Sequence, residues 1–180
     1  MSQRLTREEF QKWAEGQPRR HERIAGEPVA MAPERAMHAR LKARIWRALD
    51  RAIQEAGLNC EAFPDGMTVQ IDEDTDYEPD AVVNCGPPVH PDATVANNPV
   101  IVVEVLSPST QSIDSNDKLA DYFRVPSIQH YLIVRARRRE IIHYQRAGSD
   151  ILSRPVNLGS IRLEPPGISI DIAEIYDGTA

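Results

Sequence analysis

The chain has 180 residues, of which 41% are hydrophobic and 27% charged, and this composition predicts one compact globular domain rather than a disordered chain. The net charge of −6 argues against strong non-specific binding to a polyanion, although it allows a local basic groove. No apolar run approaches the roughly 20 residues of a membrane helix, and the N-terminus lacks a signal-peptide pattern. We therefore expect a cytoplasmic protein without a membrane partner, whose two cysteines, Cys60 and Cys85, are reduced.

Residues 1–32 are expected to form an N-terminal extension made of a helix and a hairpin. Thr6 and Glu9 have the spacing of a capping box, so a short helix should follow Thr6 and end at Gly16. The stretch RHERIAGEPVAM then predicts two short strands that turn at Ala25-Gly26. Residues 33–180 would form the core of the same domain.

The first core element is a long helix over residues 34–57, where apolar side chains recur at helical spacing and Gly57 suits a C-terminal cap. His38 lies on the apolar side of this helix. NCEAFP and MTVQID predict two strands around Asp65-Gly66. A further strand begins at Asp80, after an acidic loop, DEDTDYEPD, that we expect to be solvated.

The stretch PVIVVEVL, residues 99–106, predicts a central strand covered on both sides, because it is β-branched and apolar on both faces apart from Glu104. A helix within residues 109–127, with Ser109 or Thr110 capping the turn and Pro126 ending it, should follow. HYLIV and EIIHYQR then predict a hairpin, and GISIDIAEIYDG a strand and a helical turn. This order predicts an α/β or α+β fold with a mixed central β-sheet flanked by helices.

Glu104 raises the question of function, because an isolated buried charge is very costly and is normally neutralised, paired or bound to a metal. If the strand that begins at Asp80 is a neighbour, the two carboxylates converge at one end of the sheet. A hard divalent cation such as Mg²⁺ would relieve their repulsion. Lys118, near the start of the next helix, could reach back to orient a water or to neutralise charge on a phosphate.

Pro79-Asp80, VEVLSPST and the lysine in DSNDKLADYF, in this order, resemble the putative restriction endonuclease family of the PD-(D/E)xK nuclease superfamily. ERIAGEPVAMAP before a histidine-led helix, together with HYLIV and GISIDIAEIY, extends the resemblance over most of the chain. The resemblance implies a restriction-endonuclease-like core and a Mg²⁺-dependent endonuclease, with Mn²⁺ as a substitute ion. It also implies DNA as the substrate and a homodimer as the assembly.

The resemblance assigns roles to individual residues. Asp80 matches the Asp of the Pro-Asp motif and Glu104 the central Glu of the second motif, so both would bind the metal, with the Val105 carbonyl as a third ligand. The superfamily places a lysine where this chain has Leu106, and the lysine displaced onto the next helix matches Lys118. His38 matches a family histidine, as a metal ligand, a water-orienting group or a phosphate contact.

Structural roles remain open for the same residues. Glu104 could pair with an Arg or Lys, Asp80 could follow a turn, and Lys118 could pair with Asp114 across one helical turn. His38 could be a hydrogen-bonded residue at the edge of the core. Four further arginines either grip phosphates or form a charged hairpin tip: Arg135, Arg137, Arg138 and Arg139.

Two other functions are consistent with these residues. Leu106 and the acidic net charge favour a catalytically degenerate nuclease fold that binds nucleic acid or protein without cleavage. A hydrolase of small phosphoesters is the third option. Glu22 and Glu27, on the N-terminal hairpin, are further candidate residues for which the sequence gives no role.

Overall fold

A computed structural model describes residues 4–106 and 114–177, without the side chains of 114–116, so the expected cap at Ser109 or Thr110 lies outside the described residues. Its centre is a six-stranded mixed sheet in the order β10-β9-β8-β7-β6-β3. Strands β7 and β8 are parallel, and the other neighbours are antiparallel. In chain order the strands are β3 (Cys60–Pro64), β6 (Ala81–Cys85), β7 (Pro99–Leu106), β8 (His130–Arg135), β9 (Ile141–Ala147) and β10 (Asp150–Val156).

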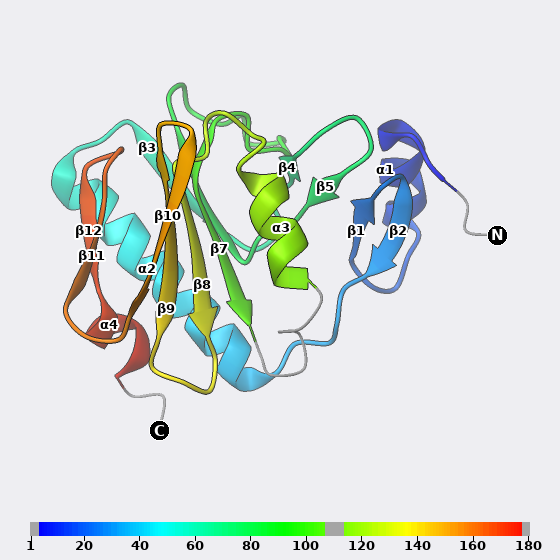
Figure 1. Cartoon of the computed structure of the whole chain (residues 1–180). Helices are drawn as coiled ribbons and strands as arrows, with labels where there is room; N and C mark the ends of the chain where they lie inside the picture. Colours follow the sequence, from blue (N-terminus) through cyan, green and yellow to red (C-terminus); the bar gives the residue numbers. More distant parts are fainter. Residues whose placement is uncertain (1–3, 107–113, 178–180) are drawn as a thin grey trace.

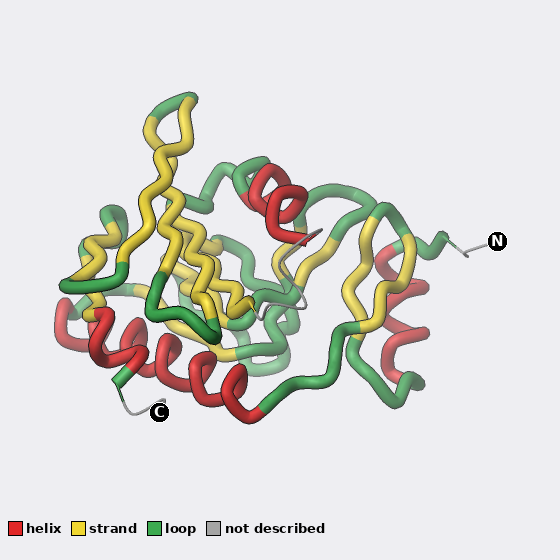
Figure 2. Tube along the Cα trace, turned by 60° about the horizontal axis from the view of Figure 1, so that its bottom comes forward, coloured by secondary structure: helices red, strands yellow, loops and turns green. Residues whose placement is uncertain are grey.

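Two helices cover opposite faces of this sheet, as Figures 1 and 2 show. α2 (Ala36–Ala56) buries its apolar stripe against one face, and the left-handed Gly57, with φ 63°, ends it as predicted. α3 (Asp114–Tyr122) lies on the other face, where Tyr122 packs against Val102 and Leu106. The predicted mixed sheet flanked by helices is confirmed. No helix of the described ranges is long and apolar enough to span a bilayer.

Strand β7 has the central position that its apolar sequence predicts. All eight of its residues are buried, Glu104 included. Neighbouring strands satisfy its backbone on both edges, and side chains cover both faces. A carboxylate in this strand is therefore held within the protein, at the end of the sheet where β7 stops.

The N-terminal extension consists of α1 (Arg7–Glu15), β1 (His21–Ile24) and β2 (Glu27–Ala30). The capping box of Thr6 with Glu9 is formed, which confirms the predicted helix start. The hairpin joins a second sheet, in the order β2-β1-β5-β4, through β5 (Asp76–Tyr77) and β4 (Val69–Gln70). Figure 1 shows this small sheet beyond α3, at the side of the molecule opposite the C-terminal elements.

The expectation of a solvated acidic loop before Asp80 is wrong for part of it. Asp76 is 4% exposed, and its carboxylate accepts a hydrogen bond from the fully buried Arg23 at 2.8 Å. Arg7 binds the same carboxylate at 3.0 Å. The arginines come from the N-terminal extension, so only the tertiary structure supplies the partners that make burial of this acid tolerable.

The chain closes with β11 (Ser160–Leu163), β12 (Ile168–Asp171) and α4 (Ile172–Tyr176). β11 and β12 form a two-stranded sheet whose buried side chains join the core beside α2. The sequence predicts β12 and α4 but neither β10 nor β11. β10 is missed because its residues are largely exposed and include Pro155, so no alternation of polar and apolar residues marks it.

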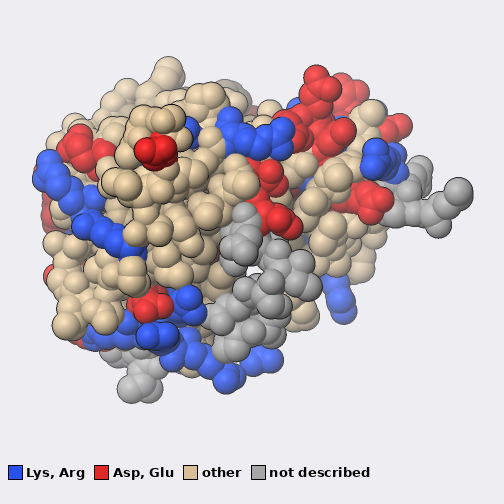
Figure 3. Space-filling view, in the orientation of Figure 1, with Lys and Arg blue, Asp and Glu red and all other residues tan. Residues whose placement is uncertain are grey.

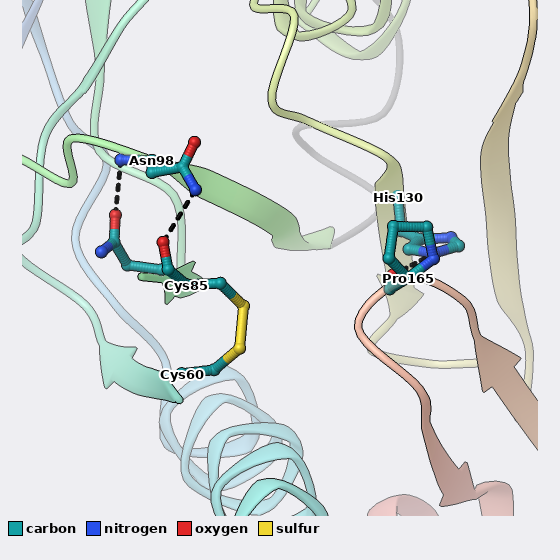
Figure 4. The surroundings of a disulfide bond; sticks show 6 residues. Cys60, Cys85, Asn98, His130 and Pro165 are labelled. Carbon is teal, nitrogen blue, oxygen red and sulfur yellow. Dashed lines mark hydrogen bonds between the residues drawn. A yellow bond between two sulfur atoms is a disulfide. The ribbon is translucent and has the colours of Figure 1, made fainter. Parts of the chain in front are cut away.

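Cys60 and Cys85 form a disulfide, which corrects the expectation of two reduced thiols. Figure 4 shows the bond at the ends of β3 and β6, where the two cysteines lie directly opposite each other. The amide of Asn98 donates a hydrogen bond to the Cys85 carbonyl at 2.7 Å beside it. A separation of 25 residues gives no sign of this contact, which depends on the pairing of the two strands.

Candidate active site

The predicted site residues meet at the C-terminal end of β7. His38 comes from the first turns of α2, Asp80 precedes β6, Glu104 and Val105 belong to β7, and Lys118 belongs to α3. Because β6 and β7 are paired, with Ala81 opposite Val103, Asp80 lies beside the end of β7. The sheet therefore brings together residues that are up to 80 positions apart in the sequence.

Glu104 is bound from the α3 side. Its Oε1 atom accepts hydrogen bonds from the Tyr122 hydroxyl at 2.7 Å and from Lys118 Nζ at 3.2 Å. Lys118 also donates to Glu22 Oε1 at 2.9 Å, and the backbone N–H of Glu78 donates to the same Glu22 oxygen at 3.0 Å. One ammonium therefore links two carboxylates from β1 and β7.

Burial raises the pKa of the Glu104 carboxyl to about 7, and the charge of Lys118 only partly opposes this effect. The neighbouring charges of Asp80 and Glu22 raise this pKa further. The single positive charge of Lys118 therefore does not offset the burial of Glu104. A bound cation would favour the ionised form of such a group.

Asp80 is bound from the α2 side and from the strand itself. Its Oδ2 atom accepts a hydrogen bond from the Val105 N–H at 2.6 Å and another from His38 Nε2 at 3.3 Å. Lys42 Nζ lies 2.9 Å from its Oδ1 atom. The hydrogen bond from the Val105 N–H holds the Asp80 carboxylate against β7, at the residue that follows Glu104.

These contacts make Asp80 and Glu104 chemically different. Burial acts to raise the pKa of Asp80, but the hydrogen bond from His38 and the charge of Lys42 outweigh it and lower that pKa. Burial acts to lower the pKa of His38, whereas Asp80 raises it more strongly. Asp80 is therefore a stable anion, while Glu104 is poised near neutral pH.

Two members of the site, Tyr122 and Lys42, were not predicted from the sequence, and Glu22 was named as a candidate without a role. Lys42 lies between Glu34 and Asp65, at 2.8 Å from each, in addition to Asp80. The position of Lys42 directly after the apolar Leu41 was the sequence signal for its role. A lysine at such a position in α2 needs buried partners for its charge.

The four residues predicted to be catalytic lie together in the structure. Asp80, Glu104, Lys118 and His38 all lie at this end of the sheet, and Val105 contributes its N–H to Asp80. Leu106, at the usual lysine position, packs in the apolar core with Tyr122. Of the two glutamates on the N-terminal hairpin, Glu22 belongs to the described contacts of the site and Glu27 does not.

The donor set fits a hard divalent cation. Two carboxylates and a backbone carbonyl are oxygen ligands, and Mg²⁺ is commonly held by one or two carboxylates together with waters and substrate phosphate. The Val105 carbonyl faces β6, as its N–H does, because both groups of a strand residue point to the same edge. Within residues 4–106 and 114–177, His, Cys, Asp and Glu side chains form no group of three or more arranged to hold a metal. The described residues therefore do not form a metal site in which side chains alone supply all of the ligands.

A cavity of about 320 Å³ adjoins the site on the side of Lys42. Arg19, Arg20, Pro33 and Asp65 are among the residues that line it. Arg20 donates to Asp65 at 2.6 Å and also pairs with Glu78. The N-terminal extension and the start of α2 both line this cavity.

Basic side chains gather at the same end of the molecule. Figure 3 shows Lys and Arg along the lower edge of the face, and Asp and Glu concentrated toward the upper right. The β8–β9 turn and the first half of α2 form this edge in Figure 1. Their exposed arginines are Arg40, Arg47, Arg137, Arg138 and Arg139.

A family model described as "Putative restriction endonuclease", Uma2, matches residues 7–173 of the chain. The chain belongs to the Uma2 family. This membership confirms the resemblance that the Pro-Asp motif, the Glu104 strand and the displaced lysine indicate. The Uma2 model covers both the N-terminal extension, with Glu22, and all of the elements that surround the site.

Two relatives and one solved structure are similar to the chain over most of its length. The uncharacterized protein slr1290 of Synechocystis is 29% identical over 180 residues, covering 98% of this chain and 94% of that protein. A second uncharacterized Synechocystis protein, sll1609, is 31% identical over 147 residues, 80% of this chain and 82% of its own. The crystal structure of a putative nuclease of DUF820 from Anabaena variabilis shares the fold, with a TM-score of 0.72 and 14% identity, over 98% of this chain and 99% of that one.

Proposed function

We propose that this Uma2 protein is a Mg²⁺-dependent endonuclease that hydrolyses phosphodiester bonds in DNA. The observation that carries the proposal is the meeting of Asp80, Glu104 and Lys118 at the end of β7, with Asp80 held as an anion and Glu104 poised near neutrality. Asp80, as a stable anion, suits the binding of a cation. Glu104, whose pKa lies near 7, also suits a proton-transfer step.

Each residue of the site has its own role in the proposed hydrolysis. Asp80, Glu104 and the Val105 carbonyl would hold the ion, which supplies a nucleophilic water and polarises the scissile phosphate when bound. Lys118 donates to the attacking water or to the phosphate oxygens as negative charge develops on them. Tyr122 and Glu22 position Glu104 and Lys118, and His38 contacts a phosphate or orients a water.

The arginines of α2 and of the β8–β9 turn support a polyanionic substrate. They border the end of the sheet that carries the site, and the acidic residues that dominate the net charge gather elsewhere on the face that Figure 3 shows. A local basic edge suffices for contacts with the phosphates of one bound duplex, since binding depends on the charges within about a Debye length. The predicted contribution of Arg137, Arg138 and Arg139 to such contacts stays a prediction.

A cleavage assay tests the proposal directly. Supercoiled plasmid and single-stranded DNA are incubated with Mg²⁺, with Mn²⁺ or with a chelator, and cleavage is expected only with a metal. Glu104→Gln and Lys118→Gln should each lower the rate by about 100-fold or more, because the first removes a ligand of the ion and the second removes a positive charge next to the reacting phosphate. Lys12→Gln is the matched control, since Lys12 is exposed on α1, and it should cleave like the parent protein.

A second function, a degenerate module that binds nucleic acid or protein without cleavage, is favoured by two observations. Lys42 already neutralises Asp80, and Leu106 at the usual lysine position is buried in the core. This alternative predicts no heat of Mn²⁺ binding in calorimetry and no cleavage of any DNA, whereas a labelled DNA or protein partner still binds. Metal-dependent cleavage that Glu104→Gln abolishes would exclude it.

A further inference from the structure

The outer edge of β10 is exposed and carries apolar side chains. Among the described strands β10 pairs with β9 alone, so its second edge faces away from the six-stranded sheet. Every residue from Asp150 to Pro155 is exposed, with Ile151 at 42% and Leu152 at 60%. Figure 2 shows the β9–β10 hairpin projecting from the body, on the side away from α2. A long exposed edge that carries apolar side chains invites pairing with another strand.

The hairpin geometry fixes which backbone groups point outward. Gly148 and Ser149 form a two-residue turn, so Ala147 and Asp150 are the pair that closes it by hydrogen bonding. Hydrogen-bonded and non-hydrogen-bonded pairs alternate along an antiparallel ladder. The backbone groups of Asp150, Leu152 and Arg154 therefore point to β9, and those of Ile151, Ser153 and Pro155 point outward. Pro155, which lacks an N–H, occupies an outward position, as expected of proline on an edge.

We propose that β10 pairs antiparallel with β10 of a second copy of this chain, about a two-fold axis at Leu152. In this register Ile151 lies opposite the partner's Ser153, and the two residues exchange backbone hydrogen bonds because both point outward. Leu152 faces the partner's Leu152. The two sheets become one continuous sheet across an isologous contact.

Charge complementarity selects this register and this occupant. With Leu152 on the axis, Asp150 lies opposite the partner's Arg154, and Arg154 lies opposite the partner's Asp150, so two ion pairs flank the leucines on one face. A shift of two residues in one direction places Ile151 against the partner's Pro155, which has no N–H to donate. A shift of two residues in the other direction leaves Arg154 with no acidic residue of the partner opposite it. The edge is thus complementary to itself in one register only.

The first test measures the mass of the protein by light scattering and sedimentation over a range of concentrations. The parent is expected to form a dimer. Ser153→Pro removes an outward donor and leaves the ladder to β9, so it should give a monomer, whereas Leu158→Lys alters an exposed leucine, at 73%, outside the strand and should remain dimeric. Asp150→Arg or Arg154→Asp alone should raise the dimer dissociation constant about tenfold or more, and the double reversal should restore it.

The second test uses cross-linking at the axis. Because Cys60 and Cys85 are bonded to each other, Leu152→Cys adds one free thiol to a chain that otherwise holds two cysteines. Opposed residues at a non-hydrogen-bonded position are close enough for a disulfide. Mild oxidation should therefore give a covalent dimer from Leu152→Cys and none from Leu158→Cys.

Clear results would overturn the proposal. A monomer at every concentration leaves the edge to another partner or to solvent. A dimer that Ser153→Pro and both single charge reversals leave intact places the contact elsewhere. Neither result bears on nuclease activity, which is measured separately, so the two proposals stand or fall independently.

Discussion

The Nζ atom of Lys118 lies 2.9 Å from Oε1 of Glu22, although 96 residues separate the two in the sequence. The same ammonium lies 3.2 Å from Glu104 Oε1. All three side chains are less than a tenth exposed. The N-terminal hairpin therefore completes the site by supplying a second buried carboxylate to a lysine that is shared between two acids.

Lys118→Ala should destabilise the protein strongly. The substitution leaves Glu22 and Glu104 buried without their shared cation, and breaking a buried ion pair costs about 3 kcal/mol or more. Urea unfolding at pH 8 measures this difference. Lys12→Ala, on the exposed side of α1, should change the free energy of unfolding by less than about 0.5 kcal/mol. Equal stability of the two variants would mean that Lys118 is not held in the observed contact.

Lys42→Met should strengthen metal binding. Lys42 Nζ lies 2.9 Å from Asp80 Oδ1, so a divalent cation at Asp80 must work against a nearby like charge. Removing that charge should lower the Mn²⁺ dissociation constant about tenfold, as measured by calorimetry. The matched control is Lys12→Met, which leaves the site unchanged. Unchanged or weaker affinity in Lys42→Met would place the ion away from Asp80.

Stability should fall with acid because of a buried histidine pair. His130 Nε2 donates to the Pro165 carbonyl at 2.8 Å, so its Nδ1 atom accepts from His143 Nε2 at 2.9 Å, and both rings are neutral. Figure 4 shows His130 beside Pro165. Burial, followed by the neighbouring His130 ring and the positive charge of Arg154, lowers the pKa of His143 from 6.5 to about 4.

The direction of the pH effect follows from this lowered pKa. Between pH 6.5 and 4 the unfolded chain binds a proton that folded His143 does not, so stability is complete above 6.5 and is lost toward pH 4. The loss from pH 7 to 4.5 should be about 2 to 3 kcal/mol larger for the parent than for His143→Gln in urea unfolding. His90→Gln, at an exposed position, should behave like the parent. Parallel pH curves for the parent and His143→Gln would contradict the assignment.

Reduction of the disulfide should destabilise the protein without abolishing the fold. The bond closes a loop of 25 residues, for which chain entropy predicts a loss of about 3 kcal/mol on reduction. Chemical denaturation with and without dithiothreitol measures it. The double variant Cys60→Ser with Cys85→Ser should match the reduced parent and ignore the reductant. A parent whose midpoint does not shift with reductant would show that the pairing of β3 and β6 needs no cross-link.

Local patterns predicted much of the architecture. Thr6 with Glu9, the stripe of α2 ending at Gly57, and the β-branched run of β7 are short-range signals, and each formed the expected element. They succeed because capping and amphipathic periodicity depend on neighbouring residues. β10 was not predicted, because an exposed edge strand can form without alternating polar and apolar residues.

The sequence by itself determined that Glu104 sits in a buried central strand and that Asp80 and Lys118 flank it in chain order. Only the tertiary structure decided which charges meet there. Lys42, Tyr122 and Glu22 became members of the site, and Cys60 met Cys85, through contacts between distant segments. Burial of a residue is largely encoded by its near neighbours, whereas the partner of a buried charge is set by how sheets and helices pack.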